Sequence, residues 1–375
     1  MSSVATLRND ERAKAAEAFA AHGLPHRRIE EWKYSDLRNA VGANDIAAAG
    51  TVAWSLPKTP SGLEVVDLSQ GVMPDWVRAH WSRLRGHGVM EEAAVAFAQG
   101  GLALRVTEDV GVAEPFHVKL SAGGHGRVLI VLEEGASLSF VETHVAAAFA
   151  NIEYEIALAA DATLHHVRVV PEAIEAVRIG TVSGTLEKSA QYRAHVADFG
   201  GKLSRFEVNL LLLGEGAEAK LSGVAVLSDK AHADVTTHIT HASGNTSSTQ
   251  LFKTVAGGHA RGVYQGRITV AEGANKSDSR QTAKGLLLGE RAEIDLKPEL
   301  EIFADDVKCA HGAAIGDLDP ESLFYLRARG LPERQARDLL IRAFLEDAVA
   351  EIENESVRAD VWHAVEDALT RAEAA

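Results

Sequence analysis

The chain has 375 residues, 46% hydrophobic and 24% charged, which is typical of a globular protein longer than one hydrophobic core usually supports. Its formal net charge of −15 argues against binding to nucleic acid or to an anionic membrane surface. The first residues contain no apolar signal segment, and no apolar run approaches the roughly 18 residues of a spanning helix. With a single cysteine, the composition predicts a cytoplasmic protein of more than one structural region.

Residues 1–100 are expected to form an N-terminal helical domain. Asn9 can cap a first helix that Gly23 ends. Residues 27–37, RRIEEWKYSDL, are dense in charge but include two aromatic side chains. Residues 50–64 contain two prolines and are expected to form a connection.

Residues 101–316 change to the pattern of β-strands. Short apolar runs rich in β-branched residues are bounded by glycine, at 128–132, 153–158, 206–213 and 263–270. A fragment with a small or acidic residue two positions before an alanine recurs, mostly at steps near 14 or 28 residues. Such a repeat predicts a β-solenoid, with a β-sandwich of evenly spaced hairpins as the alternative. The alanines of the repeat are Ala136, Ala162, Ala190, Ala217, Ala231, Ala260, Ala274 and Ala292.

Residues 317–375 are expected to form a C-terminal helical domain. Asp319 and Pro320 start one helix that Gly330 ends, Pro332 starts a second, and Ser356 can cap a third. The wide apolar stripes of these helices must pack on each other, on the end of the solenoid, or against a partner.

The chain lacks the motifs of a self-sufficient nucleotide-dependent enzyme. It contains no G-x-x-x-x-G-K-[ST] phosphate loop, no G-x-G-x-x-G after a strand, and no H-E-x-x-H, G-x-S-x-G or C-x-x-C. Any ATP hydrolysis is therefore expected in another protein.

Cys309 and His311 are the strongest candidates for chemistry. Residues two apart in an extended segment project from the same face, so the thiolate and the imidazole could reach one iron atom. Two ligands are too few for a cluster or a tetrahedral site. The alternative is a buried cysteine packed as a small apolar residue beside a hydrogen-bonded histidine.

Two other functions stay open at this point. A self-contained metalloprotein could use His232, His238 and His241, if the coils brought them together. A β-helix enzyme acting on polysaccharides could use carboxylates. The candidates for the second function are Asp305, Asp306, Asp317 and Asp319.

Three segments resemble the SufB/SufD family of the SUF iron–sulfur cluster assembly system. Residues 297–331, KPELEIFADDVKCAHGAAIGDLDPESLFYLRARGL, are similar to the family's C-terminal signature, and residues 264–295 to its last coils. Residues 27–37 match the N-terminal motif R-x-E-E-W-K-Y-[ST]-D-L. The lone cysteine and the run Cys309-Ala310-His311-Gly312 favour the SufD branch, although a SufB-like scaffold remains the alternative.

The resemblance implies a fold and a role. The fold is a right-handed parallel β-helix flanked by helical domains, in a non-catalytic subunit of a SufB–SufC–SufD scaffold. His311 would face a SufB cysteine at the joint where a transient iron–sulfur cluster forms, with Cys309 beside it. Residues 323–344 would dock the ATPase SufC, and a SufD homodimer is a further expectation.

Overall fold

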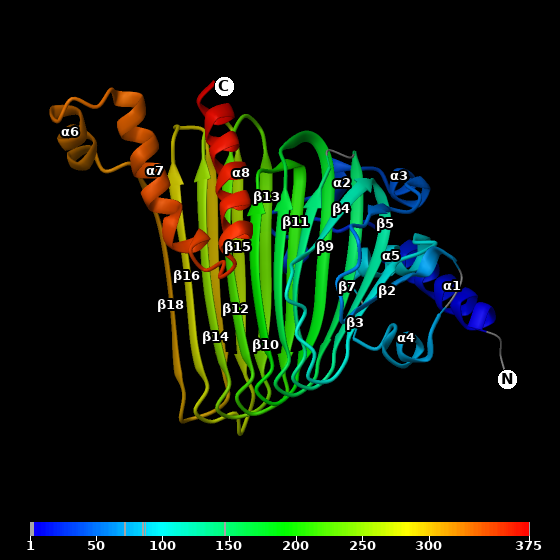
Figure 1. The fold of residues 1–375 in the computed structure, drawn as a ribbon. Coiled ribbons are helices and arrows are strands. Elements are labelled where there is room, and N and C mark those ends of the chain that lie inside the picture. Colours follow the sequence, from blue (N-terminus) through cyan, green and yellow to red (C-terminus); the bar gives the residue numbers. More distant parts are fainter. Residues whose placement is uncertain (1–3, 71–72, 85, 87, 146–147, 375) are drawn as a thin grey trace.

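The computed structural model describes residues 4–70, 73–84, 86, 88–145 and 148–374. In this part of the chain, two nine-stranded sheets lie face to face, and the chain alternates between them (Figure 1). Neighbouring strands within each sheet are parallel, except at the N-terminal edges, where β1 runs antiparallel to β4 and β2 to β3. A sandwich of hairpins would be antiparallel, so the β-solenoid is confirmed and the β-sandwich alternative is wrong.

We name the two sheets by their strands. Sheet A contains β2 (Leu63–Asp67), β3 (Leu102–Val106), β5 (Gly124–Leu132), β7 (Phe149–Leu158), β9 (Ala173–Leu186), β11 (Gly201–Leu212), β13 (His232–His241), β15 (Arg261–Val270) and β17 (Glu293–Ile302). Sheet B contains β1 (Ala53–Ser55), β4 (Phe116–Ala122), β6 (Ser137–His144), β8 (Thr163–Val170), β10 (Gln191–Asp198), β12 (Glu218–Leu227), β14 (Ser247–Ala256), β16 (Asp278–Leu287) and β18 (Lys308–Asp317).

The alanines of the sequence repeat mark the corners of the solenoid. Seven of the eight are fully buried, and Ala292 is 9% exposed. At the corner that leads into sheet B, the residue before the alanine adopts a left-handed backbone conformation, as Asp161 does with φ 59° and Gly135 with φ 67°. This conformation turns the chain sharply and favours Gly, Asn and Asp. The repeat is thus the sequence signature of the turn.

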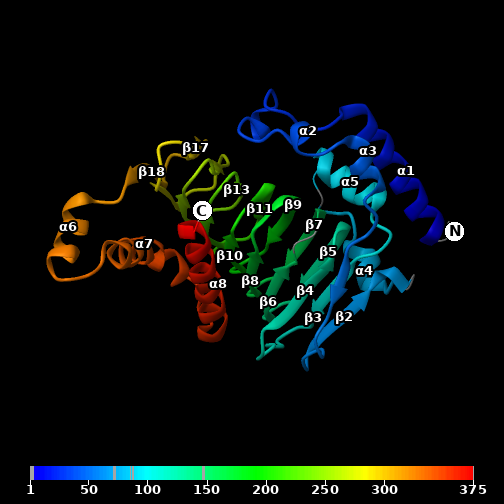
Figure 2. The same cartoon turned by 90° about the horizontal axis from the view of Figure 1, so that it is seen from above.

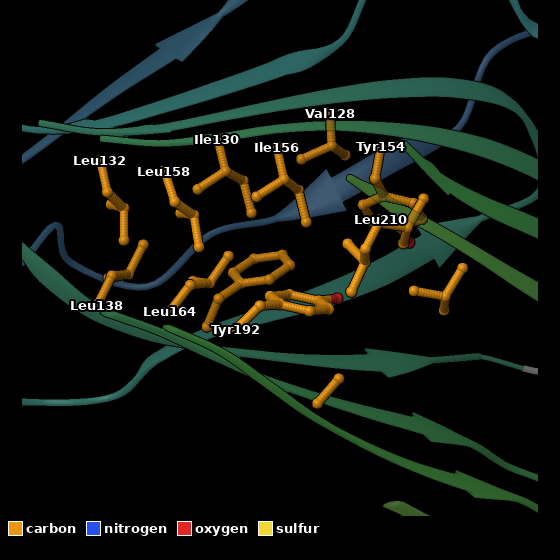
Figure 3. Packing of buried hydrophobic residues seen from close by; sticks show 14 of the residues in the cluster. Val128, Ile130, Leu132, Leu138, Tyr154, Ile156, Leu158, Leu164, Tyr192 and Leu210 are labelled. Atoms are coloured by element: carbon orange, nitrogen blue, oxygen red, sulfur yellow. The ribbon is translucent and has the colours of Figure 1, made fainter. Parts of the chain in front are cut away.

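Apolar side chains fill the space between the sheets. Val128, Ile130 and Leu132 of β5 and Tyr154 of β7 point toward the opposite sheet, where Tyr192 meets them (Figure 3). All five are at most 1% exposed. Because inward residues recur at every second position and strands stack in register, one continuous core runs through the coils.

The two sets of terminal helices cover opposite outer faces of the solenoid (Figure 2). Buried residues of the N-terminal set pack on Val177 and Ile179 of sheet A, and those of the C-terminal set on Val224 and Val255 of sheet B. The described helices are α1 (Val4–His22), η1 (Glu30–Trp32), α2 (Leu37–Ala40), α3 (Ala43–Ala48), η2 (Leu68–Gln70), α4 (Asp75–His80), α5 (Val89–Phe97), α6 (Pro320–Ala328), α7 (Glu333–Val349) and α8 (Glu355–Ala374).

Three local expectations need correction. Residues 50–64 are more than a connection, because they hold β1 and the start of β2. Asn9 is no helix cap, because α1 already runs from Val4. The cap of α8 is Asn354, whose Oδ1 accepts from the backbone N–H of Val357 at 3.1 Å and from the hydroxyl of Ser356 at 2.8 Å. Among the described helices, none combines the length and the apolar character needed to cross a membrane.

Candidate functional site

Cys309 and His311 lie on β18, the last strand of sheet B. Parallel pairing with β16 places Cys309 beside Ser279 and His311 beside Gln281. Both β16 residues are buried inside the solenoid, at 0% and 1% exposure. Aligned residues of parallel strands project to the same side, so Cys309 and His311 lie on the inner side of β18. The structure therefore brings the thiol and the imidazole to one face, as the spacing predicts.

Cys309 is half-buried against the last coil. Its side chain packs on Ile268, Val270 and Ala274. Burial, followed by the negative charge of Asp278, raises the pKa of the Cys309 thiol. The thiol is therefore mainly protonated at neutral pH, which suits a ligand that loses its proton only when a metal binds.

His311 is exposed, because no described coil follows β18 to cover it. Below it, Gln281 is 99% buried, and neither its amide nitrogen nor its amide oxygen has a hydrogen-bond partner among the described residues. Gln250, His311 and Gln281 occupy the same position on three neighbouring strands. The sequence analysis missed Gln281; the signal that would have found it is the register of the repeat, which aligns it with His311.

Few side chains on this face can serve as metal ligands. Within the described residues, no group of three or more His, Cys, Asp or Glu side chains is arranged to hold a metal ion. The arrangement offers one sulfur and one imidazole on an exposed strand. It can contribute ligands to a centre completed by another molecule.

The three histidines of the metalloprotein alternative do not come together. His241 faces the interior, where its Nδ1 lies 2.8 Å from Thr246 Oγ1 and its Nε2 lies 2.9 Å from Ser248 Oγ. His232 and His238 are on the opposite side of β13, because their positions differ from 241 by an odd number. Both ring nitrogens of His241 are thus occupied by hydroxyl groups.

The four aspartates of the polysaccharide alternative form two pairs at opposite ends of β18. Asp305 and Asp306 precede β18, and Asp317 and Asp319 lie at or beyond its other end. A ten-residue strand spans roughly 33 Å, whereas paired catalytic carboxylates lie roughly 5–10 Å apart. Asp319 instead caps α6, accepting from the backbone N–H of Ser322 at 3.0 Å.

The strand that holds the site forms an open edge. Among the described strands, β18 pairs only with β16, and β17 pairs only with β15. Large apolar side chains are exposed here: Ile302 at 42%, Phe303 at 65% and Ile315 at 46%. Unpaired strand edges with exposed apolar residues are suited to pairing with another chain.

Residues 27–37 bind across the outer face of sheet A toward this edge. Arg205 of β11 lies under the ring of Trp32, Ser35 Oγ donates to Asp234 of β13 at 2.5 Å, and Glu30 forms an ion pair with Lys297 of β17. Residues 27–37 thereby contact the start of the segment 297–331. The spacing of residues in the sequence does not predict this contact.

A second apolar surface lies on the helical tail. Helices α6 and α7 border a groove of about 930 Å³ lined by Phe324, Tyr325 and Leu339 among others. These side chains are 74%, 57% and 47% exposed. Helix α6 and the adjoining end of α7 project beyond the solenoid (Figure 1).

Comparison with known proteins identifies the family. The family described as SUF system FeS cluster assembly, SufBD core domain, matches residues 117–344. The chain is 29% identical to the iron–sulfur cluster assembly protein SufD of Escherichia coli, over 95% of this chain and 92% of that protein. It is 28% identical to a SufBD family iron–sulfur cluster assembly protein of Synechocystis, over 92% and 87% of the two chains. It is 29% identical to a SufBD family iron–sulfur cluster assembly protein of Mycobacterium bovis, over 93% of this chain and 90% of that protein. Because the family match covers more than half of the chain, this protein belongs to the SufBD family of SUF-system iron–sulfur cluster assembly proteins.

Proposed function

We propose that the chain is a SufD-type subunit of a SufB–SufC–SufD scaffold and takes no catalytic step alone. The observation that carries this proposal is the incomplete set of ligands on an open edge: Cys309 and His311 on the inner face of β18. An exposed imidazole, and a thiol that loses its proton when a metal binds, can serve as two ligands of an iron–sulfur cluster. The other ligands of the cluster come from a partner. The cluster is then a transient product held at the joint.

The partner at this edge would be SufB. Edge strands β17 and β18 offer backbone groups for pairing, and the neighbouring exposed Phe303 and Ile315 offer apolar area. In this arrangement His311 lies at the joint, and the buried amide of Gln281 supplies a hydrogen bond beside it. The same edge could pair two copies of this chain when SufB is absent.

The partner on the helical tail would be SufC. The α6–α7 groove has the exposed aromatic and aliphatic side chains that dock another protein, and the sequence has no phosphate loop of its own. ATP hydrolysis in SufC would move α6 and α7 and, through the packing of α7 on sheet B, the solenoid.

We also propose right-handed winding of the coils, since crossover connections between parallel strands are almost always right-handed. We further propose three domains: an N-terminal helical domain of residues 1–100, the β-helix core of residues 101–316 and a C-terminal helical domain of residues 317–375.

The test is co-expression of the chain with SufB and SufC, followed by measurement of iron and sulfide in the purified complex. His311→Ala should lower both contents while the complex still assembles, because His311 is exposed and its loss leaves the fold intact. His363→Ala is the matched control, because this histidine is 78% exposed on α8, away from β18. Unchanged iron and sulfide in His311→Ala, or a stoichiometric cluster on the isolated monomer, would refute the proposal.

A further inference from the structure

A cavity of about 190 Å³ lies between the outer face of sheet B and the turn that joins α7 to α8. Strands β8, β10 and β12 form its floor, and residues 350–354 form its roof. Helices α7 and α8 lie over these strands and their neighbours (Figure 1). The cavity is on the opposite side of the solenoid from residues 27–37, and Cys309 and His311 do not line it.

Its floor contains a row of basic side chains. His165, Arg193 and Lys220 are aligned partners on three adjacent strands, so their backbones are spaced by roughly 4.8 Å each. Like charges directly opposite each other destabilise a sheet. Anionic groups next to such a row offset this repulsion, as the Glu218 carboxylate does 3.7 Å from Lys220 Nζ.

The turn between the helices provides one such anion. The carboxylate of Glu353 forms an ion pair with Arg193, and its Oε2 lies 3.9 Å from His165 Nε2. The Glu353 side chain is 55% exposed, so solvent reaches it. Glu353 thus occupies the position of an exchangeable carboxylate ligand.

Behind the basic row, His195 supplies an unused hydrogen-bonding group. It is 97% buried and lines the cavity, and its Nδ1 lies 2.8 Å from Ser222 Oγ. Its Nε2 is buried without a hydrogen-bond partner among the described residues. Burial lowers the pKa of His195 to about 3, so the ring is neutral at neutral pH. Ser222 Oγ also lies 3.4 Å from the carbonyl oxygen of Ala194, to which it can donate. When Ser222 donates to the closer Nδ1 instead, the Nε2–H is free to donate to an oxygen atom in the cavity.

We propose that this cavity binds a small oxyanion, a phosphate or carboxylate group, which displaces Glu353 from Arg193. Arg193 and Lys220 supply the charge and His195 Nε2 supplies one directional hydrogen bond. The planar guanidinium pairs with two oxygens of a carboxylate or phosphate, which selects these groups over a halide. The volume limits the ligand to one of a few heavy atoms, well below the size of a nucleotide.

Displacement of Glu353 has a consequence for the helical tail. Its ion pair with Arg193 joins the α7–α8 turn to sheet B. When the ligand takes over Arg193, this joint opens, and amide hydrogen exchange in residues 350–354 should become faster.

The experiment is isothermal titration calorimetry of the full chain with inorganic phosphate and with acetate, at constant ionic strength in chloride. We expect saturable binding of at least one of the two, and the stronger one identifies the group. Arg193→Gln and Lys220→Gln should each weaken binding about tenfold, the loss of one charged hydrogen bond. Glu353→Gln should tighten binding several-fold, because the competing carboxylate is gone.

Arg280→Gln is the matched control. Arg280 continues the same row on β16, is 73% exposed and does not line the cavity, so its loss should leave the affinity within about twofold. The proposal is overturned if neither anion binds saturably, if Arg280→Gln weakens binding as much as Lys220→Gln, or if Glu353→Gln leaves the affinity unchanged. If Arg193→Gln does not fold, the partly exposed Lys220 and Glu353 still decide the outcome.

Discussion

The guanidinium of Arg205 lies beneath the ring of Trp32, with its Cζ 4.4 Å from the ring centroid, although one residue belongs to β11 and the other to the N-terminal segment. Arg205 Nη1 also donates to Asp234 Oδ2 at 2.6 Å, and the same oxygen accepts from Ser35 Oγ at 2.5 Å. Asp234 and Arg205 have fully buried side chains. A buried ion pair is thus covered by residues 27–37, which ties the N-terminal segment to the solenoid.

Arg205→Met should lower the free energy of unfolding by about 3–5 kcal/mol, because it leaves the buried carboxylate of Asp234 without its cation. Urea denaturation followed by circular dichroism measures this change. Proteolysis within residues 27–37 should become faster, because Trp32 loses its stacking partner. The double variant with Asp234→Leu should recover part of the loss, since no unpaired charge remains.

Arg342→Met is the control for this prediction. The Arg342–Glu366 pair has side chains 47% and 41% exposed, so its loss should cost less than about 1 kcal/mol. Equal costs for Arg205→Met and Arg342→Met would mean that the covered pair contributes nothing beyond a surface contact.

The free energy of unfolding should fall as the pH is lowered from about 6.5 to about 4. Burial lowers the pKa of His144 and of His241 to about 4 and that of His195 to about 3, from an unfolded value of 6.5. In this window the unfolded chain binds protons that the folded chain excludes, so stability increases with pH. Each histidine contributes up to about 1.4 kcal/mol per pH unit. Urea titrations at pH 7, 6 and 5 check the slope.

His195→Gln should reduce that slope by up to about 1.4 kcal/mol per pH unit, because one of the linked protons is removed. His363→Gln serves as the comparison, because its side chain is 78% exposed. A slope that His195→Gln leaves unchanged would contradict the assignment of His195 as a buried neutral group.

Much of the fold was predictable because a solenoid repeats one local pattern. Asp161 and Ala162 illustrate why: a left-handed turn residue followed by a small buried residue recurs at corners that lead into sheet B, so the pattern recurs in the sequence. Strands 53–55 and 63–67 were missed because they are edge strands outside the repeat, next to prolines. Their pairing depends on β3 and β4, which no local signal specifies.

The site was predictable only in part. Spacing placed Cys309 and His311 on one face, as the structure has them, because alternation along a strand is a local property. The partners from other coils were not predictable: Gln281 depends on register, and the contact of Glu30 with Lys297 depends on how the N-terminal segment crosses sheet A. Non-local contacts of this kind leave no mark within a short window of sequence.

Cys309 should react slowly with iodoacetamide at pH 7.5, at least several-fold slower than a free cysteine. Burial and the charge of Asp278 raise the pKa of the thiol, and the thiolate is the reactive form. Because the chain has one cysteine, total labelling reports on this residue alone. Asp278→Asn should accelerate labelling, whereas Asp305→Asn, in the preceding turn, should not. Labelling of the unmodified chain at the rate of free cysteine would show that the pKa is unshifted.

Two single substitutions should separate the two partner surfaces. Phe324→Asp removes a 74% exposed aromatic from the α6–α7 groove, and Phe303→Asp removes a 65% exposed one next to the β17–β18 edge. Neither side chain is in the core, so melting temperatures should stay within a few degrees. Loss of a central aromatic in an interface costs roughly 2 kcal/mol or more, about thirtyfold in affinity. Pull-down from co-expressing cells should show Phe324→Asp losing SufC and keeping SufB, and Phe303→Asp the reverse. If both substitutions weaken the same partner, the two surfaces are wrongly assigned.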